Sequence, residues 1–246
     1  TPRALWFAAL TVAALTVIDL VWASPFGRLD APSLRGFGLT PILEHPAMAV
    51  HPPLLYAGLA CTRAAAMAVL DGVDPTVWLR RTLALVTVAM AIGALWSYVE
   101  QGWGGYWAWD PVENTSLLVW LAALIALHLP QRRSLAVAGW VLALLGAALV
   151  RSGVTPSIHG FAEPARAGWA PLGLTGVSAA ALIAMNRRRP PIAADGGSVV
   201  PVVVGAAVLA LVGLGTFAPV VVGWFADRRS IVAGQFFSRT VGPVVL

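Results

Sequence analysis

The chain has 246 residues, of which 59% are hydrophobic and only 11% are charged. A soluble globular domain carries about 25% charged residues, so this composition excludes a soluble domain and indicates an integral membrane protein. The net charge of +5 does not indicate a nucleic-acid-binding protein, because the arginines occur in short loops and not in one patch. The single cysteine, Cys61, excludes an internal disulfide and a CxxC motif.

Seven apolar segments have the length of a membrane-spanning helix, which needs roughly 17–25 mostly apolar residues. In chain order they cover about 4–22, 52–70, 82–99, 111–129, 135–150, 168–186 and 199–221, and a half-span begins near 240. The sequence therefore predicts an all-α, polytopic transmembrane bundle of about seven spans, forming one membrane domain over 1–246. Because the chain lacks an initial Met and ends in an apolar run, we expect it to be a fragment of a longer protein.

Arginine pairs and a triplet occupy three short loops that alternate with the spans: 80–81, 132–133 and 187–189. By the positive-inside rule these loops face the cytoplasm. The opposite, outer face then receives the loops at about 23–51, 100–110 and 151–167. The outer loops also contain arginines, but the inner loops are shorter and carry theirs in runs, and this decides the predicted orientation.

The loop before the fourth predicted span is rich in tryptophan, reading WGGYWAWDPVEN from residue 103. So much flat aromatic surface beside a Gly-Gly pair indicates a platform for a large planar ligand on the outer face, formed by residues 100–114. The aromatic candidates are Trp103, Tyr106, Trp107 and Trp109. An aromatic belt at the membrane interface would also enrich Trp and Tyr, but it explains neither the glycines nor the two carboxylates.

Those carboxylates have the spacing of a helix start. Asp110 suits the N-cap, Pro111 the first helical position and Glu113 the third, which together form a capping box. Capping alone would account for both acids. The same geometry also aims free N–H groups and the positive end of the helix dipole at the aromatic loop, which would favour an anion there.

Two histidines share the predicted outer face with the aromatic loop. His51 precedes the second span, where the two following prolines are expected to hold it in an extended segment. His159 lies in the loop between the fifth and sixth spans. Either histidine alone is compatible with a hydrated interfacial residue, but two imidazoles flanking a tryptophan-rich loop favour axial ligands of a porphyrin iron.

Two further polar residues have open interpretations. His128 follows Pro111 by about 25 Å of helix and cannot serve the outer site. It is either a functional, bundle-facing histidine or an interfacial one at the inner surface. Arg151 precedes His159 by eight residues and is a candidate partner for a porphyrin propionate, or else an anchor to lipid headgroups.

The run WGGYWAWDPVENTSLLVWL resembles the tryptophan-rich WWD signature of haem-handling proteins in cytochrome c biogenesis, and in particular the CcmF-type subunit of the haem lyase. Three other segments resemble CcmF-type proteins in the same order: LTPILEHPAMAVHPPLLYAG, LVRSGVTPSIHGFA and VAGQFFSRTVGPVVL. The CcsA and CcmC types share the tryptophan loop but match these segments less well. Tyr106 and Ala108 depart from the family pattern, in which Trp and Phe are frequent there.

The resemblance implies that His51 and His159 are the axial ligands of haem b at the outer site. It implies that His128 is one ligand of a second, intramembrane haem whose other ligand comes from a later helix. No histidine follows His159, so that second site is incomplete in this chain.

The implied function is to hold haem at the periplasmic face of the bacterial inner membrane and present it for thioether attachment to apocytochrome c. The implied partners are apocytochrome c, a haem chaperone, other maturation subunits and membrane lipid, with no nucleic acid. The sequence offers no nucleophile–base pair, so no catalytic residue is assigned, and whether the chain is itself an enzyme stays open. A haem exporter and a haem-b electron-transfer subunit are the alternative functions.

Overall fold

The computed structural model describes residues 2–22, 26, 35–36, 38–100, 105–129, 133–152, 154–155, 157–159, 169–186, 198–226 and 232–245. All regular secondary structure in these residues is helical. The helices are α1 (Pro2–Trp22), α2 (Ala47–Asp71), α3 (Thr76–Glu100), α4 (Pro111–His128), α5 (Arg133–Ser152), α6 (Trp169–Asn186), α7 (Val199–Ala226) and α8 (Gly234–Val245), with a short 3₁₀ helix at Pro41–Leu43. The predicted all-α class is confirmed.

Each predicted span coincides with one of the helices α1 to α7. Five segments are long and apolar enough to cross a membrane: Ala4–Val21, Ala47–Asp71, Thr76–Glu100, Pro111–His128 and Val199–Gly223. The apolar parts of α5 and α6, Leu135–Leu149 and Ala170–Ala184, are shorter. The chain is therefore a polytopic helical membrane bundle.

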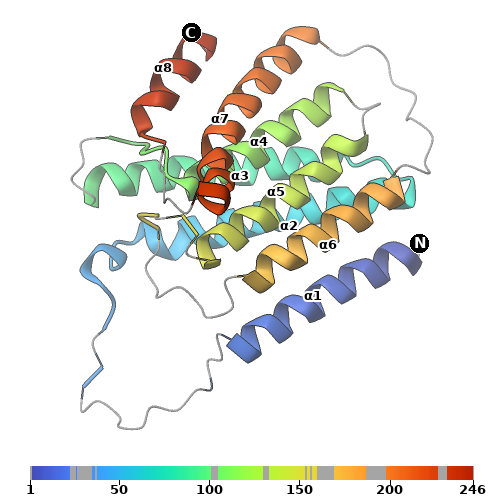
Figure 1. Cartoon of the computed structure of the whole chain (residues 1–246), viewed down its shortest axis with the longest axis horizontal. Helices are drawn as coiled ribbons and strands as arrows, with labels where there is room; N and C mark the ends of the chain where they lie inside the picture. Colours follow the sequence, from blue (N-terminus) through green and yellow to red (C-terminus); the bar gives the residue numbers. More distant parts are fainter. Residues whose placement is uncertain are drawn as a thin grey trace.

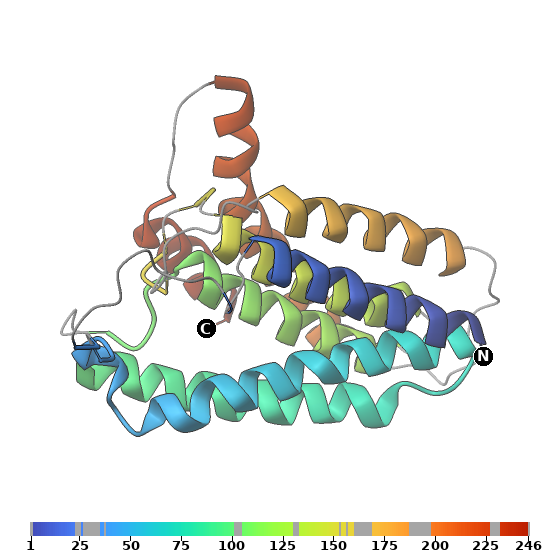
Figure 2. The ribbon, with the colours of Figure 1, turned by 90° about the horizontal axis from the view of Figure 1, so that it is seen from below.

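Helix α4 lies at the centre of this bundle, where it contacts α3, α5 and α7 (Figure 1). In its candidate span 61% of the residues are buried, against 11% to 33% in the other four spans. Helices α2 and α3 run side by side along one edge (Figure 2). A structural change at the start of α4 would therefore affect its packing against α3, α5 and α7.

The start of α2 differs from the prediction. The helix begins at Ala47, so that His51, Pro52 and Pro53 lie inside its first turns and not in an extended segment before it. Proline is tolerated near a helix N-terminus because the first N–H groups have no intrahelical partner. As a result, a helix that packs along α3 holds His51.

The C-terminal segment also differs from the expected half-span near 240. Helix α8 begins at Gly234 and packs one apolar face against the bundle. Phe237, only 1% exposed, and Val241 meet side chains of α4 and α7 in a single cluster. This cluster places α8 beside the start of α4, next to the tryptophan-rich loop.

Candidate functional site

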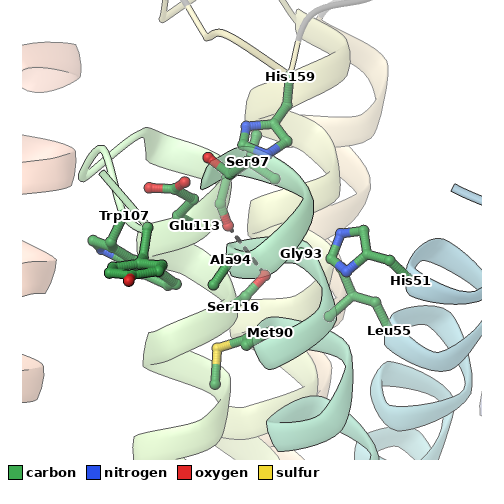
Figure 3. A pocket seen from close by; sticks show the side chains of 12 residues that line it. His51, Leu55, Met90, Gly93, Ala94, Ser97, Trp107, Glu113, Ser116 and His159 are labelled. Carbon is green, nitrogen blue, oxygen red and sulfur yellow. Dashed lines mark hydrogen bonds between the residues drawn. The ribbon is translucent and has the colours of Figure 1, made fainter. Parts of the chain in front are cut away.

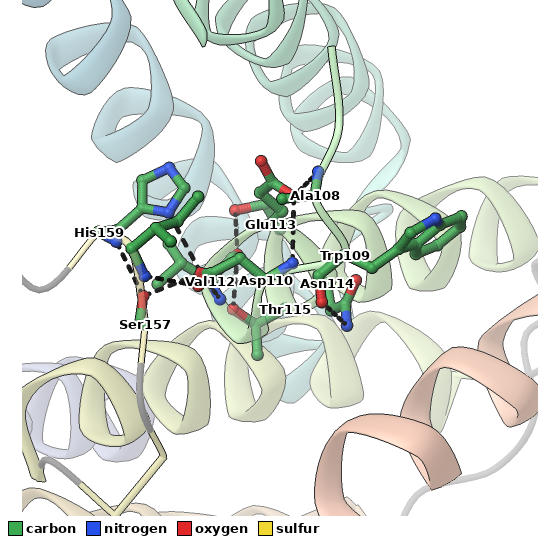
Figure 4. A network of polar contacts seen from close by, with 11 residues as sticks. Ala108, Trp109, Asp110, Val112, Glu113, Asn114, Thr115, Ser157 and His159 are labelled. Atoms are coloured by element: carbon green, nitrogen blue, oxygen red, sulfur yellow. Dashed lines mark hydrogen bonds and ion pairs between the residues drawn. The ribbon is translucent and has the colours of Figure 1, made fainter. Parts of the chain in front are cut away.

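The predicted capping box is present at the start of α4 (Figure 4). Asp110 is an extended N-cap residue, and its Oδ1 accepts a hydrogen bond of 2.9 Å from the amide of Val112. Glu113 Oε2 accepts from the amides of Asp110 at 3.2 Å and Ala108 at 2.8 Å. Glu113 therefore folds the end of the aromatic loop back onto the helix that follows it.

Asp110 also binds a segment distant in sequence. Its Oδ1 accepts from the Ser157 hydroxyl at 2.9 Å, and its Oδ2 accepts from the Ile158 amide at 2.9 Å. Nδ1 of His159 lies 3.1 Å from Oδ1 (Figure 4). The Asp110 side chain is buried, with the residue 7% exposed, and fixes residues 157–159 to the start of α4.

The electrostatics of this contact favour the ionised form of the Asp110 carboxyl. Burial alone would raise the pKa of the Asp110 carboxyl, but His159 and the amides of Val112 and Ile158 outweigh it, and the pKa lies below its ordinary value. An ionised carboxylate only accepts hydrogen bonds, so His159 donates through Nδ1. In the neutral imidazole, Nε2 then carries the lone pair that binds a metal.

His51 is fixed in the same tautomer by a different acceptor. Its Nδ1 lies 2.7 Å from the carbonyl oxygen of Ala89 in α3. A carbonyl oxygen only accepts, so Nδ1 carries the proton and Nε2 carries the lone pair. Gly93 makes room for the ring, because a Cβ there would lie 2.6 Å from Cε1 of His51.

Both histidines line one cavity of about 40 Å³ (Figure 3). Its other walls come from α3, α4 and the aromatic loop, and the residues are Leu55, Met90, Gly93, Ala94, Ser97, Tyr106, Trp107, Val112, Glu113 and Ser116. One water molecule needs about 10–15 Å³ of such a cavity, so this volume corresponds to about three water molecules. The structure thus brings together five predicted site residues: Tyr106, Trp107 and Glu113, with His51 and His159 on two sides.

Two buried hydrogen-bond donors in the cavity wall have no partner: the hydroxyl of Ser97 and Nε1 of Trp107. Ser97 is only 5% exposed. Buried polar groups in folded proteins are almost always satisfied, so two unsatisfied donors among the residues of one cavity are unusual. Sequence reasoning missed Ser97 and Gly93, because a small residue within an apolar span carries no signal of its own.

Several predicted site residues lie elsewhere or cannot be placed. Trp109 does not line the cavity; its ring stacks on Phe237 of α8 with centroids 5.2 Å apart. Trp103 and the side chain of Arg151, in the last turn of α5, fall outside what the structure describes. Tyr106 lines the cavity and stacks on Tyr98 at 4.7 Å.

His128 is the last residue of α4, at the opposite end of the helix from Asp110. Its Nδ1 lies 2.8 Å from the carbonyl oxygen of Leu124 in the same helix. Among the residues that the structure describes, no group of three or more His, Cys, Asp or Glu side chains could hold a metal ion. The role of His128 in a second haem site stays a prediction.

Comparison with known proteins shows what this arrangement is similar to. Residues 76–152, which include most of α3, α4 and α5, match the family model "Cytochrome C assembly protein". The chain is 35% identical to "Probable cytochrome c-type biogenesis protein NrfE" of Escherichia coli (strain K12), over 98% of this chain and 50% of that protein. It is 33% identical to "Cytochrome c-type biogenesis protein CycK" of Bradyrhizobium diazoefficiens, over 96% of this chain and 41% of that protein.

A solved structure, "Cytochrome c Heme Lyase CcmF", superimposes with a TM-score of 0.65 at 25% identity, covering 98% of this chain and 40% of that chain. Fold and cavity define a polytopic helical membrane protein with two imidazoles at one pocket. Residues 76–152 match the cytochrome c assembly family model, and the chain is similar to CcmF, NrfE and CycK proteins. It spans half or less of the length of the relatives named here, and the predicted family resemblance is confirmed.

Proposed function

We propose that this chain binds haem between His51 and His159 and presents it for covalent attachment to apocytochrome c. The observation that carries the proposal is the pair of histidines on one cavity, each with Nδ1 held by an acceptor, Ala89 or Asp110. Holding Nδ1 leaves Nε2 as the coordinating nitrogen and fixes the ring orientation. The chain spans half or less of the length of these relatives. Any activity that belongs to a complete protein of that length is therefore proposed for this chain and not established.

The residues at the cavity fit haem in three respects. Two imidazoles suit a six-coordinate iron, and the Trp107 indole supplies apolar aromatic surface. The unpartnered donors of Ser97 and Trp107 suit a ligand with acceptor atoms, such as carboxylate or water. Bound haem would supply the vinyl groups that become linked to the thiols of the cytochrome.

The chain itself would act by binding and orientation. Cys61 lies ten residues beyond His51 on α2, about 15 Å along the helix, and is not among the residues that line the cavity. The thiols that react with haem would therefore come from the apocytochrome. This supports a role in which the chain holds the ligand and supplies no nucleophile of its own.

We further propose that the cavity faces the periplasm of the bacterial inner membrane. The cavity lies at the end of α3 that leads into the aromatic loop, whereas Arg80 and Arg81 lie in the first turns of the same helix. The cavity residues of α3 lie about 14 to 25 Å from these arginines along the axis, a large part of the hydrocarbon thickness. Basic residues at the far end fit a cytoplasmic location. A haem chaperone, other maturation subunits and lipid are the proposed partners.

The test is to purify the variants His51→Ala and His159→Ala and to measure haem content and absorption spectrum. We expect each variant to lose most of its haem, and added imidazole to restore part of it. His45→Ala is the matched control, because His45 lies six residues before His51 and its ring accepts from the amide of Ala47 in its own segment. If both single variants retain wild-type haem content and spectrum while the control does too, the axial assignment is wrong.

A further inference from the structure

Trp109 has an unusual backbone conformation. Its φ is +59°, and it is the one non-glycine residue with positive φ in the part of the chain that the structure describes. A large side chain is unfavourable in the left-handed region, and such a residue persists only where its surroundings hold it there. The residue lies between Trp107, which lines the cavity, and Asp110, which binds residues 157–159.

Three contacts hold Trp109 in this conformation. The ring stacks on Phe237 with an interplanar angle of 14°. The indole Nε1 donates to the hydroxyl of Ser238 at 3.0 Å. The carbonyl oxygen accepts from Nδ2 of Asn114 at 3.1 Å, and the same amide donates to Thr216 of α7 at 3.0 Å. Both the side chain and the backbone of Trp109 are therefore fixed by the α7–α8 side of the bundle.

The contact between α8 and the loop is close. A Cβ at Gly234 would lie 3.2 Å from the carbonyl oxygen of Ala108, so the first residue of α8 meets the loop backbone directly. A Cβ at Gly215 of α7 would lie 2.5 Å from the Phe237 ring. Glycine at both positions lets α8 approach closely enough for Phe237 to meet Trp109.

The left-handed residue decides where its neighbours point. In an extended segment, residues two apart point to the same side, so Trp107 and Trp109 would share one side. Instead Trp107 lines the cavity, Trp109 turns its ring onto α8, and the two rings meet edge to face at 6.1 Å. The same turn places the Asp110 carboxylate within hydrogen-bond distance of Ser157, Ile158 and His159.

We propose that Trp109 is a positioning residue and not a surface for the ligand. Helix α8 holds it through Phe237 and Ser238, and Trp109 in turn sets the placement of Asp110 and, through Asp110, of His159. The geometry of the cavity thus depends on a helix that does not line it. The effect on haem binding rests on the proposed function of the cavity. The effect of α8 on the position of the loop is independent of any ligand.

The test uses the full chain and removes one hydroxyl from the exposed face of α8. Ser238→Ala should weaken haem binding by about two- to tenfold, the range that corresponds to one hydrogen bond. In haem-free protein it should also speed hydrogen exchange of the peptide that contains Ile158, because the amide of Ile158 bonds to Asp110. Ser238→Thr keeps the hydroxyl and should restore both properties.

Thr240→Ala is the matched control, since its hydroxyl bonds to the carbonyl of Phe236 in its own helix. It should change neither property. Trp109→Phe keeps a ring but loses the N–H, so its effect and that of Ser238→Ala should not add in the double variant. The inference is overturned if Ser238→Ala behaves like Thr240→Ala, or if Trp109→Phe weakens haem binding without changing exchange.

Failure of this inference can be told from failure of the proposed function. If His159→Ala loses haem while Ser238→Ala leaves affinity and exchange unchanged, the haem site stands and the role of α8 is wrong. If His159→Ala keeps its haem, the proposed function is wrong, and the exchange data on haem-free Ser238→Ala still decide whether α8 positions the loop.

Discussion

Two junctions between helices share a local sequence pattern and differ in what they do. At the turn from α2 to α3, a left-handed residue, Gly72, is followed by Asp74 and Pro75, which precede the first residue of α3. At the junction from α3 to α4, a left-handed residue, Trp109, is followed by Asp110 and Pro111. Both aspartates accept from an amide two residues later, at 3.0 Å and 2.9 Å. A carboxylate that accepts from the backbone at a helix start is therefore common to both.

The difference lies in the remaining lone pairs of each carboxylate. Asp74 is exposed and accepts only from Thr76, through its amide and its hydroxyl. Asp110 is buried and accepts in addition from three groups of residues 157–159. A carboxylate has about four acceptor positions, so one side chain can cap a helix and bind a distant segment at once. The first junction obeys the local rules; the second departs from them by placing tryptophan where glycine is expected.

The largest expected effect comes from removing each carboxylate in turn. Asp110→Ala should lower the free energy of unfolding by about 3 kcal/mol, because it leaves several buried donors without an acceptor. It should also release His159 and so reduce haem content. Asp74→Ala should cost about 1 kcal/mol, the usual effect of losing a hydrogen bond, with haem content unchanged. Denaturant unfolding in detergent and haem quantification measure the two properties. Equal effects of both substitutions on haem would show that the junctions do not differ in function.

Gly72 and Gly93 have different structural roles: one has a positive φ, and the other makes room for the His51 ring. Gly72→Ala should destabilise the fold by about 1–2 kcal/mol, since its φ of +77° is unfavourable for a residue with a Cβ. Gly93→Ala should cost about 1–3 kcal/mol through overpacking, because the new Cβ would meet the ring of His51. Only Gly93→Ala should change the haem spectrum, because only that Cβ would displace His51, the proposed haem ligand.

Gly173→Ala in α6, where a Cβ would have nothing within 4 Å, is the control for both glycine substitutions. It should leave stability and spectrum close to wild type. A normal haem spectrum in Gly93→Ala would mean that His51 can move away from Gly93 without consequence. The ring position described by the structure would then not matter for the ligand.

Much of the fold was predictable from the sequence, since long apolar runs separated by arginine, proline and glycine mark the helices. The capping box at Asp110 and Glu113 was also predictable, because it depends on residues close in sequence. The start of α2 was not. The local effect of Pro52 and Pro53 predicts an extended His51, but packing of the first turns of α2 on α3, including the contact of His51 with Ala89, places it in a helix.

The contacts that complete the candidate site could not be predicted from one sequence. Trp109 and Ser238 are 129 residues apart, and nothing local in either segment specifies the other. Ser97 and Gly93 become meaningful only once α2 and α3 are packed together. The sequence indicated which residue types gather on one face, and the residues that orient them depend on tertiary packing. The haem roles assigned to those residues stay predictions.

The smallest expected effect is a pH dependence of stability caused by Asp74. The hydrogen bonds from the hydroxyl and the amide of Thr76 hold the pKa of the Asp74 carboxyl below its ordinary value, although slight burial opposes them. A group with a lowered folded-state pKa contributes stability that is present above its unfolded pKa and is lost as pH falls through the folded pKa. The Asn side-chain oxygen can accept the same hydrogen bonds from Thr76 but does not titrate. The melting temperature of the wild type should therefore exceed that of Asp74→Asn slightly at pH 7, and the gap should close as pH falls below about 4. A gap that stays constant or widens on acidification would contradict this assignment.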